Sequence, residues 1–261
     1  MDYLKHNRLV WNRQSSRNCI WSLPVDSSIV AKARQGEWKV LLTPSLPVPR
    51  SWFGDLRGRR VLCLASGGGQ QAPVLAAAGA RVVSFDLSEE QLAKDAMVAE
   101  RDGLPIDCVQ GNMTDLSCFG DGCFDLVFHP SANSFVADVR PVWRECHRVL
   151  RGGGALLAGF NNPAVFLFDH DEADRTGTLV VKHGLPYADA TSLSAQALAQ
   201  RREKAEPLQF SHSLDEQIGG QIEAGFAIVG FYEDRWFDDS WLFSTLSPVS
   251  MATRALRAAK S

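Results

Sequence analysis

The sequence predicts an α/β protein built around a parallel β-sheet, and three observations indicate this fold class. Residues 61–86 read as a strand, a glycine-rich loop, a helix and a second strand, which together make one βαβ unit. From there to residue 160, short apolar runs alternate with helical patterns. The chain of 261 residues is long enough to bury the core of such a domain. We therefore expect apolar strands in the centre and helices on both faces.

Composition and charge are those of an ordinary globular protein. Apolar residues make up 45% of the chain, charged residues 22%, and the net charge is −3. Without a long basic run, this balance gives no reason to expect a nucleic-acid partner. The apolar stretches are too short to span a bilayer, and the charged N-terminus lacks a signal-peptide pattern. We expect a cytoplasmic protein with no membrane partner, while its oligomeric state stays open. Six scattered cysteines predict buried free thiols, with Cys63 and Cys108 in strands and Cys146 on an apolar helix face, and no metal site.

Residues 1–50 precede the βαβ unit. Helices are expected at 4–14 and from Ser27 or Ser28 to about residue 35, followed by an extended, proline-rich stretch. Four of the seven tryptophans lie within the first 52 residues. Each tryptophan taken singly is expected to pack this segment onto the domain. As a whole, the segment is expected to act as a lid over a ligand.

The βαβ unit carries the clearest functional signal. Its first strand, 61–65, runs directly into glycines at 67–69, where the backbone can turn sharply and a ligand can approach it. A helix follows at 70–78, and the next strand, 81–85, ends at Asp86. The amides at a helix N-terminus and a nearby carboxylate suit an adenosine-bearing cofactor, because the carboxylate can accept hydrogen bonds from ribose hydroxyls.

The same residues also fit a dinucleotide-binding pattern. Gly67, Gly69 and Ala72 satisfy G-x-G-x-x-G/A, and Asp86 follows at about the expected spacing of ~20 residues. The βαβ context favours nucleoside binding over a simple tight turn. The pattern alone leaves the identity of the cofactor open.

Strands and helices continue to alternate after this unit. A capping box of Ser88 and Gln91 opens a helix that closes near residue 103. The third strand is expected at 105–110 and the fourth at 124–128. Their carboxyl ends are expected at the same edge of the sheet as the glycine loop.

Ligands of open α/β sheets bind at that edge. Asn112 and Met113 follow the third strand and are candidates to contact adenine, with Met113 packing on the ring and Asn112 bonding its amino group. The alternative is that these two residues form a surface turn. His129 and Ser131 follow the fourth strand at the same edge.

The next elements complete the first part of the sheet. Residues 138–150 have the period of an amphipathic helix, and 155–160 form the fifth strand. Residues 161–210 then break the pattern with an irregular stretch, which is acidic at 169–177 and is expected to be helical and charged at 192–207. An insertion of this size between strands is expected to form a cap that shapes a substrate site.

The remaining sequence returns to the sheet. A helix is expected at 213–225, with strands at 226–233 and at 249–256. The chain thus divides into an N-terminal lid at 1–50, a cofactor-binding core at 51–160, a cap insertion at 161–210 and the C-terminal part of the core sheet at 211–261.

The order of these motifs resembles the class I S-adenosylmethionine-dependent methyltransferases. The resemblance is carried by VLCLASGGGQ, VVSFDLS, VQGNMTDL, FDLVFHPS, RVLRGGGALLAGF and EAGFAIVGFYEDR. LASGGGQQ and FHP are similar to a bacterial branch of that family. The resemblance implies a Rossmann-like, seven-stranded mixed sheet of order 3-2-1-4-5-7-6 with an antiparallel last strand. It also implies S-adenosyl-L-methionine as cofactor and S-adenosyl-L-homocysteine as product.

Candidate site residues follow from the same resemblance. The glycine loop would hold the methionine part of the cofactor, Asp86 the ribose, and the loop after the third strand the adenine. The segment after the fourth strand would lie near the transferred methyl group. The candidate cofactor-binding residues are Ala65, Ser66, Gly67, Gly69, Gln70, Asp86, Leu87, Asn112, Met113, His129 and Ser131.

Three positions depart from the family pattern. Cys63 stands where the first strand usually carries an acid, Ala65 replaces the first loop glycine, and Asn112 replaces an acid after the third strand. A cysteine offers no fixed negative charge, so these changes are expected to weaken or shift the cofactor contacts. They leave the predicted fold unchanged.

The predicted reaction is an in-line displacement on the methyl group, promoted by placing the nucleophile and excluding water. His129 is the candidate general base, because it titrates near neutrality and follows the fourth strand. The alternative is that His129 has no catalytic role and only forms local hydrogen bonds or contacts the cofactor. The expected acceptor is a small molecule bound beneath the lid and the insertion. An NAD-dependent oxidoreductase and a non-catalytic cofactor-binding protein remain as alternative functions.

Overall fold

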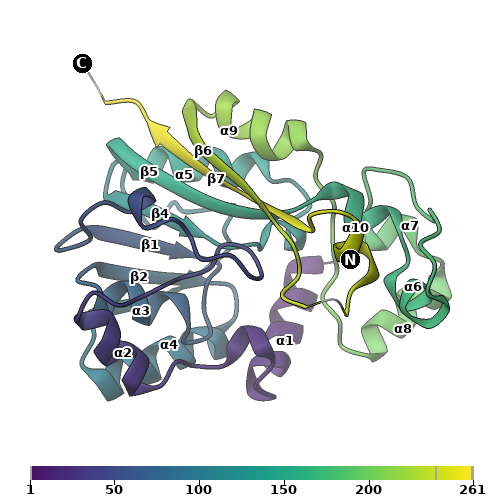
Figure 1. The fold of residues 1–261 in the computed structure, drawn as a ribbon, viewed down its shortest axis with the longest axis horizontal. Coiled ribbons are helices and arrows are strands. Elements are labelled where there is room, and N and C mark those ends of the chain that lie inside the picture. Colours follow the sequence, from purple (N-terminus) through teal and green to yellow (C-terminus); the bar gives the residue numbers. More distant parts are fainter. Residues whose placement is uncertain (1, 239, 260–261) are drawn as a thin grey trace.

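The computed structural model describes residues 2–238 and 240–259. A seven-stranded sheet of order β3-β2-β1-β4-β5-β7-β6 forms its centre (Figure 1). Strands β1 to β5 pair in parallel, and β7 runs antiparallel to β5 and β6. The predicted fold class and strand order are therefore confirmed. The strands are β1 Arg60–Leu64, β2 Arg81–Asp86, β3 Ile106–Gln110, β4 Phe124–His129, β5 Leu150–Asn161, β6 Phe226–Asp234 and β7 Ser250–Arg257.

Helices cover both faces of the sheet (Figure 1). One face carries α2 Ser27–Arg34, α3 Gln71–Ala77 and α4 Glu89–Asp102, and the other carries α5 Arg140–Val149 and α9 Gly220–Glu223. Side chains of a strand alternate between faces. Cys63 of β1 accordingly packs in the core under α2 and α3, while Leu62 and Leu64 pack in the core under α5. Two separate apolar cores thus hold the sheet between its helices.

The remaining helices lie beyond the carboxyl ends of the parallel strands. They are α1 Tyr3–Ser16, α6 His170–Thr176, α7 Asp189–Ser192, α8 Ala195–Glu203 and α10 Leu242–Leu246. In Figure 1, α6, α7, α8 and α10 form a group on the right, with α1 between them and the sheet. Short helical turns occupy Ile20–Ser22, Arg50–Trp52, Asn133–Phe135, Pro163–Leu167 and Asp215–Gly219.

Two elements differ from the sequence-based expectation. Strand β5 starts at Leu150 instead of residue 155, because the glycine run continues the pairing with β4 through a register shift between Phe124 and Leu126. In the insertion, the helix expected within 192–207 is present as α8, which Ser194 caps. The acidic stretch before it also forms a helix, α6, which was not expected and which Asp169 caps.

Two further findings concern the surface. No helix in the described part of the chain is long and apolar enough to cross a membrane. All six cysteines are free thiols. Cys63 and Cys146 are buried, whereas Cys108 is exposed, contrary to a buried position in the third strand. Strand β3 is an edge strand, which leaves that side chain open to solvent.

Candidate functional site

A cavity of about 1280 Å³ opens at the carboxyl edge of the sheet. The loops that follow β1, β2, β3 and β4 all contribute to its lining, as expected for an open α/β sheet. The N-terminal segment, the insertion and the chain around residues 236–250 complete its walls. Nine predicted site residues line this cavity: Ala65, Ser66, Gly67, Gln70, Asp86, Leu87, Asn112, Met113 and Ser131.

Asp86 is held at the cavity by two backbone amides. Gly67 N–H donates to its Oδ2 (3.0 Å) and Ser88 N–H to its Oδ1 (2.9 Å). Each carboxylate oxygen still has a lone pair for a ligand hydroxyl. Burial raises the pKa of Asp86, and the amide bonds act against that rise. The carboxylate is therefore fixed in direction and able to accept further hydrogen bonds.

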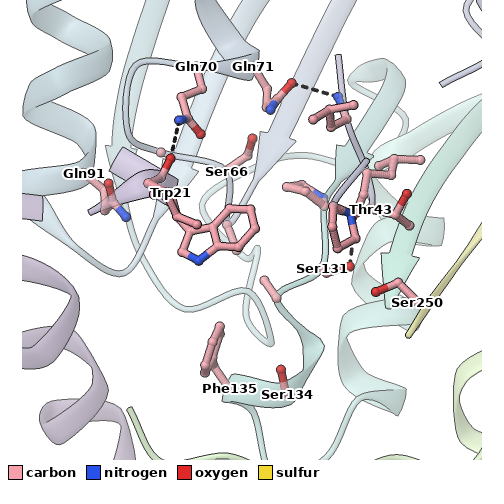
Figure 2. A pocket seen from close by; sticks show the side chains of 18 of the residues that line it. Trp21, Thr43, Ser66, Gln70, Gln71, Gln91, Ser131, Ser134, Phe135 and Ser250 are labelled. Atoms are coloured by element: carbon pink, nitrogen blue, oxygen red, sulfur yellow. Dashed lines mark hydrogen bonds between the residues drawn. The ribbon is translucent and has the colours of Figure 1, made fainter. Parts of the chain in front are cut away.

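Two buried polar atoms of the cavity wall lack a hydrogen-bond partner among the described residues. They are Ser66 Oγ and Gln91 Oε1, and both side chains lie around the cavity in Figure 2. Buried polar atoms are nearly always hydrogen-bonded, so such orphans point to a polar ligand. Together with Asp86, they fit the adenosine-bearing cofactor that the sequence predicts.

Gly69 takes a different part from the predicted one. It does not line the cavity, and its N–H donates to Oδ1 of Asp95 on α4 (2.8 Å). Its carbonyl accepts from Val25 N–H (2.8 Å), and an added Cβ would lie 2.8 Å from Cβ of Pro24. The N-terminal segment, not a ligand, therefore occupies the space that glycine provides here.

His129 lies away from the cavity, which does not support its predicted part as a general base or as a cofactor contact. The side chain is fully buried. Its Nδ1 donates to the carbonyl of Leu64 (2.9 Å), and its Nε2 lies 2.7 Å from Oδ1 of Asn133. Burial lowers the pKa of His129. Both ring nitrogens are engaged within the core, so the imidazole links β1 to the segment after β4.

Gln91 is a site residue that the sequence pattern did not reveal. A capping box returns the glutamine side chain to the N–H of Ser88. Here Asp86 already accepts that N–H, and only the reverse bond forms, from Gln91 N–H to Ser88 Oγ (3.2 Å). The side chain of Gln91 therefore does not cap the helix and lies in the cavity wall, where its Oε1 is buried without a partner among the described residues.

The N-terminal segment is fastened to the glycine loop and to the far wall. Gln70 Nε2 donates to the carbonyl of Ile20 (2.8 Å), beside Trp21 in Figure 2. Trp21 also packs edge-on against Trp236, with 5.9 Å between ring centroids. This contact joins the N-terminal segment to the C-terminal part of the chain around the cavity.

The part of the cavity beneath the insertion is aromatic. Phe135, Phe166, Trp236 and Trp241 line it, together with hydroxyl groups such as those of Ser134 and Ser250. Figure 2 shows Phe135, Ser134 and Ser250 at the cavity. These six groups are uncharged, while Asp174 and Arg201 of the insertion also line the cavity. Arg201 is paired with Asp189 and Glu206. A compact apolar molecule with a few hydrogen-bonding groups would suit this lining.

His170 also lines this part of the cavity, but its ring is already engaged. Trp241 Nε1 donates to its Nδ1 (2.7 Å), and its own Nε2 donates to the carbonyl of Val165 (2.8 Å). Burial lowers the pKa of His170, which agrees with a neutral ring. The imidazole therefore fixes Trp241 in place.

Comparisons with known proteins agree with the geometry. A family model described as a methyltransferase domain matches residues 62–158. The "Uncharacterized methyltransferase YbaJ" of Bacillus subtilis is 50% identical over 230 residues, which cover 88% of this chain and 90% of that protein. The ubiquinone biosynthesis O-methyltransferase of Pseudomonas aeruginosa is 31% identical over 140 residues, 52% of this chain and 60% of that protein.

A solved structure supports the fold. An S-adenosylmethionine-dependent methyltransferase from Mesorhizobium loti superimposes with a TM-score of 0.60 at 20% identity. The match covers 80% of this chain and 95% of the other. At that identity, the likeness concerns the arrangement of the sheet and its helices.

Proposed function

This chain belongs to the class I S-adenosylmethionine-dependent methyltransferases, and from that premise we propose that it methylates an apolar small molecule. The observation that carries the proposal is the aromatic lining of the cavity beyond the glycine loop. Bound S-adenosylmethionine supplies an activated methyl group on its sulfonium. The task of this chain is then to place the two reactants in line and to exclude water.

The cofactor is proposed to lie across the strand-end loops. Ser66 and Gly67 would face its methionine part, and Asp86 would accept hydrogen bonds from the ribose hydroxyls. Met113 would pack on the adenine ring. Asn112 is partly engaged already, because its Oδ1 accepts from Thr114 N–H (3.1 Å). Its side-chain amino group is the part left for a ligand.

The acceptor is proposed to occupy the aromatic part of the cavity. Ligand pockets usually measure about 300–1,000 Å³, and a cavity of about 1280 Å³ has room for a second molecule beside the cofactor. The relatives named as ubiquinone biosynthesis O-methyltransferases are named for a small molecule, which agrees with such an acceptor. The comparisons favour neither an oxidoreductase nor a non-catalytic binding protein.

The N-terminal segment at 1–50 and the insertion at 161–210 are proposed to close the cavity over both reactants. Trp11 of α1 packs edge-on against Phe135, with 5.1 Å between ring centroids. Phe166 of the insertion stacks on Tyr187 at 5.5 Å. These contacts hold aromatic walls in place, and a dry site strengthens the electrostatic interactions that act on the reacting groups.

The proposal is tested with S-adenosylmethionine carrying a labelled methyl group and a bacterial extract split into small-molecule and macromolecular fractions. We expect label in an organic-soluble small molecule. Label only in protein or nucleic acid would refute the proposal. Phe135→Ala should raise the KM for the acceptor while S-adenosylhomocysteine still binds. The matched control is Phe231→Ala, which removes an exposed aromatic ring outside the cavity.

A further inference from the structure

A buried carboxyl group lies beneath the glycine loop, outside the cavity lining. Asp95 is fully buried in the middle of α4. Its Oδ1 accepts from Gly69 N–H (2.8 Å), and its Oδ2 accepts from Ser84 Oγ (2.6 Å). Ser84 pairs in register with Cys63 on the neighbouring strand. The carboxyl group therefore lies below the end of β1, where the sequence has Cys63 in place of an acid.

Burying a carboxylate in this way is costly for the fold. Burial raises the pKa of Asp95 to about 7, against the lowering effects of Ser84 and Gly69. The titratable groups that interact electrostatically with it are Asp86 at the end of β2, Cys63 on β1 and Cys108 on β3. All three carry negative charge or none. An apolar residue at this position would avoid the cost, so a buried carboxyl group here is a candidate for a functional role.

The hydrogen bonds indicate what that function is. Gly67 N–H donates to Asp86, and Gly69 N–H donates to Asp95. Two carboxyl groups thus hold two amides on either side of Gly68, and Gly69 keeps a left-handed backbone with φ of +76°. Ser66 and Gln70, which flank this stretch, line the cavity. The direction of their groups depends on how the loop is held.

We propose that Asp95 is a positioning residue of this methyltransferase: its carboxylate holds the glycine loop in the shape that receives the cofactor. This inference rests on the proposed position of the cofactor at that loop. Asp95 does not touch the cofactor and acts through the Gly69 amide. It supplies from α4 a negative charge that the first strand lacks at Cys63.

A pH dependence follows from this arrangement. An ionised carboxylate is the stronger acceptor for the Gly69 amide. As the pH falls through about 7, Asp95 takes up a proton and this bond weakens. Cofactor affinity should therefore fall as the pH is lowered from 8 to 6. Uptake of a single proton with a midpoint near pH 7 limits the total fall over this range to about tenfold. Asp86 lines the same loop and remains in every variant below.

The test is calorimetric titration of the full chain with S-adenosylhomocysteine between pH 6 and pH 8. We expect the wild-type dissociation constant to rise toward pH 6. Asp95→Asn keeps the size of the side chain and removes its titration, so its affinity should be weaker at pH 8 and nearly independent of pH. A wild-type profile that is flat across this range would overturn the proposal.

Ser84→Ala provides a second variant with a specific expectation. It removes the bond to Oδ2 and leaves the Gly69 bond in place. Because the Ser84 bond lowers the pKa of Asp95, its loss should move the midpoint of the affinity profile to higher pH. An unchanged midpoint would also overturn the proposal. Complete absence of S-adenosylhomocysteine binding at every pH would instead refute the proposed cofactor site.

Discussion

Asp86 shows how one side chain gains a function from its backbone partners. The amides of Gly67 and Ser88 orient its carboxylate toward the cavity. Sequence reasoning found this residue because its position at the end of the second strand is fixed by the βαβ pattern. It could not find Gln91, because the competition between Asp86 and Gln91 for the Ser88 amide depends on three-dimensional distances.

Removing this carboxylate should weaken cofactor binding. Asp86→Ala deletes charge-assisted hydrogen bonds to the ribose. We expect S-adenosylhomocysteine to bind more weakly, with a binding free energy less favourable by at least ~1 kcal/mol. Calorimetric titration measures the change. Asp107→Ala removes an exposed carboxylate from the neighbouring strand β3 and serves as the control. Equal affinities for the two variants would show that Asp86 does not bind the ribose.

His129 illustrates the opposite outcome. Its place after the fourth strand suggested a base, yet the side chain turns inward and bonds to Leu64 and Asn133. His129→Ala would leave those groups unpaired, at a cost of about 1–3 kcal/mol for each buried group. We expect a lower free energy of unfolding, measured with urea, and a turnover per folded molecule close to that of the wild type. A large fall in turnover at unchanged stability would restore the catalytic role.

The same histidine predicts how stability responds to acid. Burial lowers the pKa of His129 in the folded state below its unfolded value of about 6.5. The unfolded chain therefore binds the proton more readily, and stability contributed by the neutral ring is lost as the pH falls below about 6.5. Urea unfolding of the wild type and of His129→Ala across this range should show a smaller acid-induced loss in the variant. Parallel pH profiles would contradict this assignment.

At the scale of single elements, the glycine loop is shaped as much by the protein as by its ligand. The glycine triplet predicted a backbone that a cofactor approaches, and Gly67 does line the cavity. Gly68 and Gly69 instead make room for the N-terminal segment, since a Cβ on Gly68 would lie 2.8 Å from the carbonyl oxygen of Trp21. The glycine loop and the N-terminal segment are far apart in the sequence, so no local sequence pattern predicts this contact.

Gly69→Ala tests this second use of the loop. Its φ of +76° makes any side chain strained, and the new Cβ would meet Pro24. Gly153 has almost the same φ, +77°, but nothing within 4 Å of an added Cβ, so Gly153→Ala measures the backbone strain alone. That strain is worth roughly 1–2 kcal/mol. We expect Gly69→Ala to lose more thermal stability than Gly153→Ala and also to bind S-adenosylhomocysteine more weakly. Equal losses of thermal stability in the two variants would mean that the N-terminal segment moves away from the new Cβ at no energetic cost.

At the scale of the whole molecule, the strand order was predictable because this chain carries the motifs of the class I methyltransferases in the same order as that family. The alternation of strands and helices alone predicts only a parallel α/β sheet. The closure of the cavity was not predictable in detail, because it joins α1, the insertion and the chain near Trp236 through contacts of long sequence separation. The part of residues 1–50 as a lid stays a prediction, and the residues that fasten this segment to the rest of the chain were not expected.

Asn7 is the residue through which α1 is fastened to the end of the insertion. Its Nδ2 donates to the carbonyl of Leu208 (3.0 Å) and its Oδ1 accepts from Leu208 N–H (2.8 Å), so the buried amide pairs with one backbone unit on both sides. Asn7→Ala leaves both groups of Leu208 without this partner, and the cost of each buried group is about 1–3 kcal/mol. Because Asn7 and Trp11 lie on the same side of α1 and both line the cavity, loosening this helix should also open the site.

We therefore expect Asn7→Ala to lower the melting temperature, to raise the dissociation constant for S-adenosylhomocysteine, and to let acrylamide quench more of the tryptophan fluorescence. Lys5→Ala, an exposed position on the same helix, should change none of these. If Asn7→Ala lost stability but kept its affinity and its quenching, α1 would brace the fold without covering the cavity. Such a result would leave the insertion and the chain near Trp236 to exclude water, since these are the other walls that surround the aromatic part of the cavity.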